Sequence, residues 1–164
     1  MMTLVVGRPD SGKSKLAEDM VLELSGGRRK IYIATMIPFG EEGKRRIEKH
    51  RRLREGKGFE TVECPVDLGS ISGIEGAVCL LECVSNLVGN EMHKEGREGC
   101  KVEEIADLVT EEIELLNSRA AELVAVTNEF ELEDGFDEDT RKYIEITDLV
   151  NKRLFAIADR VEEV

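Results

Sequence analysis

The chain has 164 residues, of which 41% are hydrophobic and 35% charged, and its formal net charge is −12. This length predicts one compact domain, residues 1–164, with an aliphatic core because the chain contains no tryptophan. General nucleic-acid binders are basic because they neutralise phosphates, so the acidic balance argues against nucleic acid as a partner.

The sequence lacks the features of secreted and membrane proteins. Its N-terminus has neither the charged region nor the apolar run of a signal peptide, and no segment is apolar enough for a membrane span. The cysteines are not spaced like zinc ligands, which favours reduced thiols at Cys64, Cys79, Cys83 and Cys100. We therefore expect a cytoplasmic protein.

Apolar runs alternate with segments of helical spacing along the chain. The apolar runs predict buried strands at residues 2–6, 31–34, 77–81 and 122–127, with a shorter strand at 59–63. Apolar residues three and four apart predict helices at residues 14–24, 41–54, 102–116 and 137–161, and a further helix begins near Ser85. Strands that are apolar on both faces and alternate with helices are typical of a mostly parallel central sheet with helices on both faces. The predicted class is three-layer α/β.

Residues 7–14, GRPDSGKS, match the phosphate-loop pattern G-x-x-x-x-G-K-[ST] between a predicted strand and a predicted helix. The glycines allow backbone N–H groups to surround phosphate oxygens, and Lys13 can reach the outer phosphates. Ser14 can hold Mg²⁺ at the start of the helix. Asp10 is unusual near phosphates, and Arg8 could offset its charge. The predicted nucleotide contacts of this loop are Gly7, Arg8, Pro9, Asp10, Ser11, Gly12, Lys13 and Ser14.

A nucleoside triphosphatase of this class also needs an acidic residue at the end of another strand. Glu82 directly follows the apolar run 77–81 and is the candidate second ligand for Mg²⁺, although a Glu here could also cap the next helix. Ligands of open α/β sheets gather at the carboxyl ends of the strands. We therefore expect Gly7, Thr35, Glu82 and Asn128 to lie along one edge of the sheet.

One stretch of this acidic chain is strongly basic. Residues 44–57 contain eight Lys or Arg against two Glu. In a helix, Arg46, His50 and Arg54 share one face, which could form a phosphate clamp around a histidine nucleophile. Spacing alone leaves two other interpretations open, a solvated basic helix and a nucleic-acid patch. His93 is expected to be a loop or helix-surface residue.

Several motifs occur in a family-specific order over nearly the whole chain. Together they resemble the bifunctional adenosylcobinamide kinase / adenosylcobinamide-phosphate guanylyltransferases of cobalamin biosynthesis. The R-I-x-x-H-x-x-x-R segment, followed by T-x-E, L-L-E-C and V-T-N-E, is the specific part of the match. The matching segments are GRPDSGKS (7–14), YIAT (32–35), RIEKHRRLR (46–54), FETVE (59–63), LLECVSNLVGN (80–90), VTNE (126–129) and RKYIEITDLVNKRLFAIADRV (141–161).

The resemblance implies a RecA-like P-loop NTPase fold and a homotrimer. It implies an enzyme that phosphorylates adenosylcobinamide with GTP or ATP, and then transfers GMP from GTP to the corrinoid phosphate through a GMP-histidine intermediate. His50 falls on the histidine that carries GMP. Besides the phosphate loop and Arg46, the implied nucleotide-binding positions are Ala34, Thr35, Met36, Arg51, Arg52, Leu53, Arg54, Glu63 and Glu82.

The chain also differs from the family pattern. Arg8 and Asp10 replace a glycine and an arginine of the usual loop, and the segment ELEDGFDEDT after VTNE is short and acidic. The family has a final strand after its last helix, of which we expect at most a stub here. Two alternatives follow, a P-loop kinase or NTPase with another acceptor, and a non-catalytic nucleotide-binding protein.

Overall fold

The structure is a computed structural model that describes residues 1–164. One six-stranded sheet forms its centre, and every neighbouring pair of strands is parallel. The strand order is β3-β2-β4-β5-β1-β6. The strands are β1 (Met2–Gly7), β2 (Lys30–Ala34), β3 (Phe59–Glu63), β4 (Val78–Leu81), β5 (Glu122–Asn128) and β6 (Arg160–Glu163).

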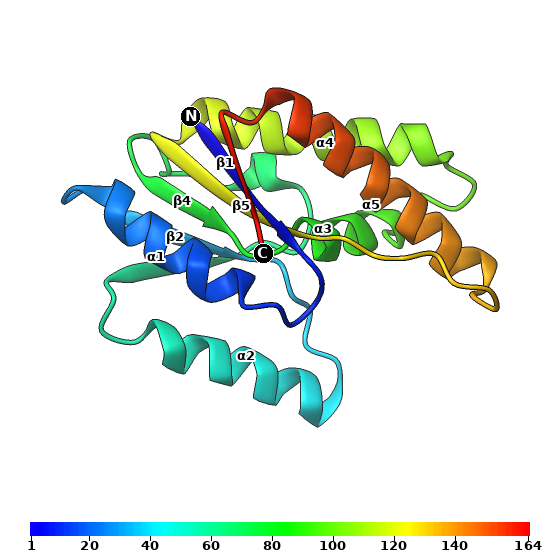
Figure 1. Cartoon of the computed structure of the whole chain (residues 1–164), viewed down its shortest axis with the longest axis horizontal. Coiled ribbons are helices and arrows are strands. Elements are labelled where there is room, and N and C mark those ends of the chain that lie inside the picture. The colour runs from blue at the N-terminus through cyan, green and yellow to red at the C-terminus, as the bar shows by residue number, and fades with distance from the viewer.

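Helices cover both faces of the sheet, which confirms the predicted three-layer α/β class (Figure 1). On one face, α1 packs Ala17, Met20 and Val21 against the sheet in a cluster of 9 buried residues. On the other face, α3, α4 and α5 share a cluster of 27 buried residues. The helices are α1 (Lys13–Ser25), α2 (Gly40–Arg54), α3 (Val84–Met92), α4 (Val102–Arg119) and α5 (Glu138–Ile157), with a 3₁₀ turn η1 at Leu68–Ser70.

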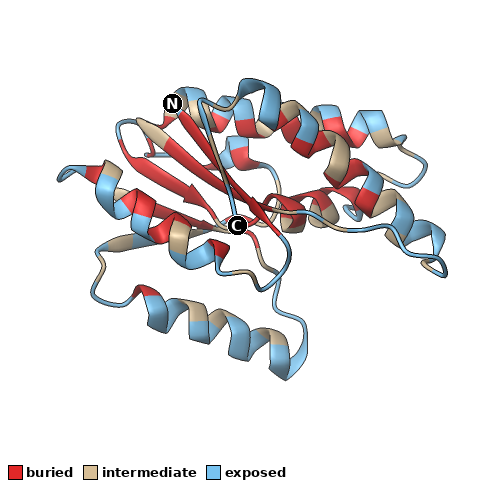
Figure 2. Ribbon diagram, viewed as in Figure 1, coloured by how far each residue is buried: buried red, intermediate tan, exposed pale blue.

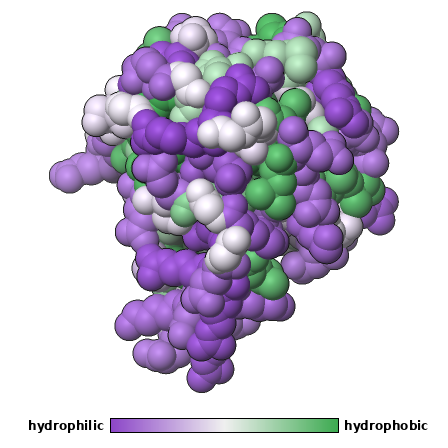
Figure 3. Space-filling model, turned by 90° about the vertical axis from the view of Figure 1, so that its left-hand side faces the viewer, coloured by the Kyte–Doolittle hydropathy of each residue, from purple (hydrophilic) through white to green (hydrophobic).

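Helix α2 differs from the other helices because it is not part of the core. Only Arg54 is buried, since the helix GEEGKRRIEKHRRLR contains just two apolar side chains, Ile47 and Leu53. Figure 2 shows α2 exposed along nearly its whole length, and the lowest part of the surface in Figure 3 is predominantly hydrophilic. The one buried attachment of α2 therefore lies at its C-terminal end.

The end of the chain differs from the prediction. Helix α5 stops at Ile157, because the backbone of Ala158 is already extended, and residues 160–163 form β6 beside β1. The carboxylate of Asp159 accepts a 2.8 Å hydrogen bond from the N–H of Met2. The predicted helix to residue 161 is thus wrong, and so is the expectation of at most a stub, since a final parallel strand is present.

No helix combines the length and the apolar character needed to cross a lipid bilayer. All four cysteines are free thiols, as the sequence predicts. Cys64, Cys79 and Cys83 are buried and Cys100 is partly exposed.

Candidate functional site

The carboxyl ends of the strands meet along one edge of the sheet, as predicted. Gly7 pairs with Asn128 across the end of β1 and β5. Beside them, the N–H of Glu82 donates to the carbonyl of Ile33 at 3.0 Å, and the hydroxyl of Thr35 donates to the carbonyl of Cys83 at 3.2 Å. These contacts bring four segments of the chain to one edge.

The phosphate loop makes a tight turn between β1 and α1. Asp10 and Gly12 have left-handed backbone angles, with φ of 58° and 88°, and α1 begins directly afterwards at Lys13. Gly7 sits where no side chain fits, because an added Cβ would lie 2.8 Å from both Ser11 Oγ and the carbonyl of Val164. The loop therefore presents the N-terminal amides of α1, which favour anions.

Lys13 is held inside this loop. Its side chain is buried, and Nζ donates to the carbonyl oxygen of Arg8 at 2.6 Å and to Ser11 Oγ at 3.5 Å. Burial lowers the pKa of Lys13, while the nearby Cys83 and Asp10 oppose that shift. A cation folded against its own loop can exchange these contacts for phosphate oxygens of higher charge.

A cleft of about 420 Å³ opens at this edge of the sheet and joins the phosphate loop to α2. Arg46 and His50 both line it, and neither side chain forms an ion pair or hydrogen bond within the protein. Loop residues 9–14 and the predicted histidine thus face the same space. The lining residues are Pro9, Asp10, Ser11, Gly12, Lys13, Ser14, Met36, Arg46, His50, Glu82, Cys83, Asn86, Val126 and Asn128.

Glu82 and Ser14 lie in this cleft as the two candidate ligands for Mg²⁺. The Oε1 atom of Glu82 is buried and has no hydrogen-bond partner, and Ser14 is exposed on the first turn of α1. A hard cation would satisfy that orphaned carboxylate oxygen. No group of three or more His, Cys, Asp or Glu side chains could hold a metal ion. The donors therefore fit an ion that takes its remaining ligands from water and substrate phosphates, as Mg²⁺ does.

A second, narrow cavity lies behind the cleft and shares Met36, His50 and Glu82 with it. Its volume is about 20 Å³, which suffices for a water molecule and not for a base. Six of the nine GTP positions that the family resemblance implies outside the phosphate loop line this space. The lining residues are Ala34, Met36, Ile47, His50, Arg51, Arg54, Thr61, Glu63 and Glu82.

Several predicted contacts are engaged within the protein. Arg51 forms an ion pair with Glu63. The guanidinium of Arg54 lies 3.6 Å from the centroid of the Tyr32 ring. The structure thus brings Arg51, Arg54 and Glu63 close to His50. A nucleotide that contacts these side chains would have to replace their present interactions with one another and with Tyr32.

Arg52 and Leu53 are not brought to either cavity. Both are exposed on the solvent side of α2, where Arg52 pairs with Glu48 at 2.7 Å. Arg8 does not offset Asp10, contrary to expectation. It instead forms a 2.7 Å ion pair with Glu131 in the acidic segment after β5, a partner 123 residues away that local sequence does not indicate.

Cys83 and Asn86 also line the cleft, and sequence reasoning did not single them out. Their place in the sequence is the one feature that indicates a role, because both follow the buried strand β4 at the start of α3. Ser85, between them, accepts a 2.8 Å hydrogen bond from Asn128, which ties α3 to the end of β5. His93, expected to lie on the surface without a role, is exposed and lines a larger neighbouring cavity.

Comparison with known proteins assigns the chain to a family. A search of curated proteins gives no match. A family model described as cobinamide kinase / cobinamide phosphate guanyltransferase matches residues 3–164, nearly the whole chain. The match spans the phosphate loop, α2 with His50, and the final strand. The chain belongs to the cobinamide kinase / cobinamide phosphate guanyltransferase family of cobalamin biosynthesis.

Proposed function

We propose that this protein phosphorylates adenosylcobinamide and then transfers GMP from GTP to adenosylcobinamide phosphate through a GMP-histidine intermediate on His50. One observation carries the proposal: His50, without a hydrogen-bond partner in the protein, lines the same cleft as the phosphate loop. Membership of the family supports the overall reaction. The homotrimer implied by the resemblance stays a prediction.

The phosphate loop supplies the charge stabilisation for both steps. Loop amides and Lys13 surround the outer phosphates of the bound nucleotide, where a cation in a site shielded from water contributes several kcal/mol to stabilising the developing charge. Ser14 and Glu82 would hold Mg²⁺, which when bound neutralises phosphate charge. Arg46, on the His50 side of the cleft, would position the phosphates.

Guanylyl transfer then divides into two displacements at the α-phosphorus. The neutral imidazole of His50 attacks, so that a P–N bond forms while the bond from the α-phosphorus to its bridging oxygen breaks and pyrophosphate leaves with the electron pair. A phosphate oxygen of the corrinoid then attacks the same phosphorus. The P–N bond breaks, and its electron pair returns to the imidazole. Splitting one transfer in this way is the general advantage of a covalent intermediate.

The shallow attachment of α2 would allow this helix to move when the nucleotide binds. The narrow cavity holds about 20 Å³ in the present position of the helix, and six of the nine implied GTP contacts outside the phosphate loop line it. Because only Arg54 of α2 is buried, displacement of the rest of the helix exposes little apolar surface and costs little free energy. We propose that α2 opens for the nucleotide and closes with His50 against the α-phosphate.

Pyrophosphate release in the absence of any corrinoid tests this proposal. Incubation with Mg²⁺ and GTP should release pyrophosphate in a burst of about one equivalent per chain, because the GMP stays on the histidine. His50→Ala should abolish the burst while retaining GTP binding. Lys49→Ala, the exposed neighbour on α2, is the control and should behave like the wild type. GTP binding without any burst would instead indicate a kinase-only or binding-only protein.

A further inference from the structure

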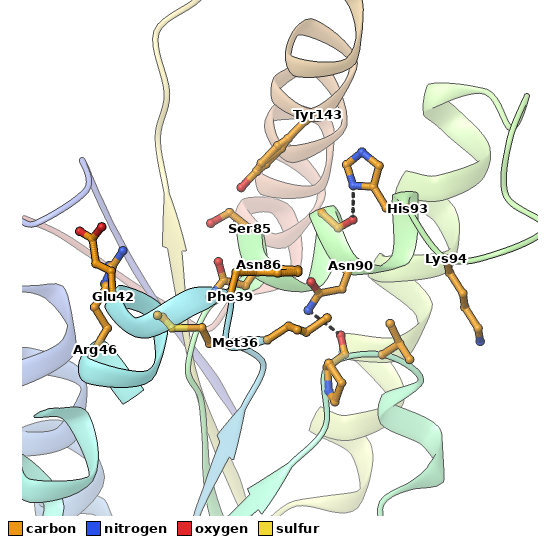
Figure 4. Close-up of a pocket in the computed structure, with 15 residues that line it drawn as sticks. Met36, Phe39, Glu42, Arg46, Ser85, Asn86, Asn90, His93, Lys94 and Tyr143 are labelled. Atoms are coloured by element: carbon orange, nitrogen blue, oxygen red, sulfur yellow. Dashed lines mark hydrogen bonds between the residues drawn. The ribbon is translucent and has the colours of Figure 1, made fainter. Parts of the chain in front are cut away.

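We propose that a cavity of about 940 Å³ beside the nucleotide cleft binds the cobinamide acceptor, an inference that rests on the proposed function. The cavity lies between α2 with the segment before it, the start of the β3–β4 connection at Pro65 and Val66, helix α3, and the first turns of α5. Figure 4 shows side chains from these elements facing one space.

The cavity adjoins the site of phosphoryl and guanylyl transfer. Met36, Arg46 and Asn86 line both the cavity and the nucleotide cleft, so the two spaces meet at these residues. A transfer requires the attacking oxygen to approach phosphorus to about 3–3.5 Å, so the acceptor must enter from a space continuous with the cleft. The cavity also lies within the volume range of small-molecule sites, about 300–1,000 Å³.

Apolar side chains from three parts of the chain line the cavity. Ile37, Val66 and Tyr143 line it together with Phe39, whose side chain is 77% exposed at the end of the short apolar run 36–39. An apolar ring left in water at the mouth of a cavity gains free energy when a ligand covers it. A corrin macrocycle with its methyl groups offers a flat apolar surface that could pack against these side chains.

Two of the polar lining residues, Asn90 and His93, already have hydrogen-bond partners in the protein. Asn90 builds the wall, because its amide already donates to the carbonyls of Thr35 and Pro65 at 2.7 and 2.9 Å. His93 is likewise engaged, with Gly89 and Asp139 on its two ring nitrogens.

Asn86 and Lys94, by contrast, form no hydrogen bonds with the other lining residues in Figure 4. Their side chains can form hydrogen bonds with the amide groups around a corrin ring. Arg46, at the junction with the nucleotide cleft and without a partner in the protein, suits the phosphate of cobinamide phosphate.

Gly89 offers a way to close the cavity without disturbing the fold. It lies in the middle of α3 and lines the cavity, and a Cβ added there meets no atom within 4 Å. Replacing a glycine inside a helix also removes a cost of about 1 kcal/mol, so a larger residue should not destabilise α3. Gly89→Trp would therefore fill space that the acceptor needs.

Equilibrium dialysis with cobinamide, followed by its visible absorbance, tests the inference. Gly89→Trp should lower cobinamide affinity by at least about tenfold, while GTP affinity and the pyrophosphate burst remain at wild-type levels. Glu114→Trp, which adds the same side chain on the exposed face of α4, should leave cobinamide affinity unchanged. Phe39→Ala should weaken cobinamide binding by about tenfold, and Phe155→Ala, at the far end of α5, should not.

Failure of the cavity assignment and failure of the proposed histidine chemistry would give different results. Unchanged cobinamide affinity in both Gly89→Trp and Phe39→Ala would overturn the assignment of the cavity, and a persistent burst would leave the proposed function standing. A wild-type protein that shows the burst but binds no cobinamide would overturn the identity of the occupant. A missing burst together with cobinamide binding that Gly89→Trp blocks would refute the histidine chemistry and support the cavity.

Discussion

The guanidinium of Arg54 lies 3.6 Å from the centroid of the Tyr32 ring and forms the only buried attachment of α2. Its Nη2 also donates to Thr61 Oγ1 at 3.4 Å on the neighbouring strand β3. A stacked cation of this kind stabilises by about 0.5–2 kcal/mol. His50 lies one helical turn before Arg54. The contact between Arg54 and Tyr32 therefore positions the part of α2 that carries His50 at the cleft.

Arg54→Ala should therefore uncouple nucleotide binding from histidine chemistry. We expect the pyrophosphate burst to slow by about tenfold, since a free energy of about 1.4 kcal/mol in positioning corresponds to that factor. GTP affinity should fall much less, because the phosphate loop is untouched. Arg45→Ala, an exposed arginine of the same helix, is the matched control in stopped-flow and binding measurements. Equal losses in GTP affinity and burst rate would show that Arg54 contacts the nucleotide directly.

Lys13→Ala should abolish nucleotide turnover while the protein stays folded. The side chain bonds only to its own loop, at Arg8 and Ser11, so its removal leaves the core intact. A loss of several kcal/mol in transition-state stabilisation corresponds to a rate decrease of about a thousandfold. Steady-state turnover and thermal unfolding, measured together, check this prediction. Lys15→Ala, an exposed lysine on the same helix, should retain activity; retained activity in Lys13→Ala would refute the assigned role.

Glu82→Gln should weaken Mg²⁺-dependent GTP binding without lowering the stability of the folded protein. Its buried, unpartnered Oε1 implies that neutralising the carboxylate leaves stability unchanged or raises it. Burial raises the pKa of the adjacent Tyr32, and the Glu82 carboxylate raises it further. If Glu82 holds Mg²⁺, the variant should lose the Mg²⁺-dependent part of GTP affinity in calorimetry, whereas Glu23→Gln should not. A variant with wild-type Mg²⁺ dependence would remove Glu82 from the metal site.

A buried carboxyl pair joins η1, α3 and α4 on the other face of the sheet. Glu91 accepts a 3.0 Å hydrogen bond from the N–H of Asp67, and Glu112 accepts one of equal length from Leu68. Arg97 pairs with Glu91 at 3.3 Å. Burial raises the pKa of Glu112 to about 8, and the neighbouring Glu91 contributes to the increase.

The raised pKa of Glu112 predicts a pH-dependent stability. The folded protein keeps this proton to about pH 8, whereas an unfolded glutamate releases it near its ordinary value of 4.5. The stabilising contribution is thus complete below the ordinary value and is lost as the pH rises toward 8, by up to about 1.4 kcal/mol per pH unit.

Glu112→Gln, which mimics the protonated carboxyl, should match the wild type at pH 5 and exceed its stability at pH 9. Urea denaturation across this range measures the difference between the two proteins. Parallel pH profiles for the two proteins would contradict the assignment.

The sequence predicted the parts of the fold that local patterns encode. The sequence predicts a strand at residues 59–63, which are the bounds of β3 in the structure, and it predicts the phosphate loop between a strand and a helix, as observed. The spacing of Arg46, His50 and Arg54 also placed them on one face of a real helix, and all three line the two adjoining cavities.

Local sequence patterns do not predict contacts between residues that are far apart in the chain. Leu154, Ile157, Ala158 and Val161 have helical spacing, yet Val161 pairs with Leu4 in β6, because hydrogen bonds to β1 and the Asp159 contact to Met2 outweigh the local preference. The Arg8–Glu131 ion pair and the stacking of Arg54 on Tyr32 likewise depend on tertiary structure alone. Nothing in the local sequence marks Asn86 as a residue shared by two cavities.

The most direct test of the central claim is covalent labelling from GTP. The protein is mixed with Mg²⁺ and GTP labelled at either the α- or the γ-phosphate, then denatured and separated from free nucleotide. We predict that only the α-label stays on the chain, that it is lost in acid and stable in base, and that His50→Ala carries none. Retention of the α-label in His50→Ala, or its absence from a wild-type protein that binds GTP, would contradict the account.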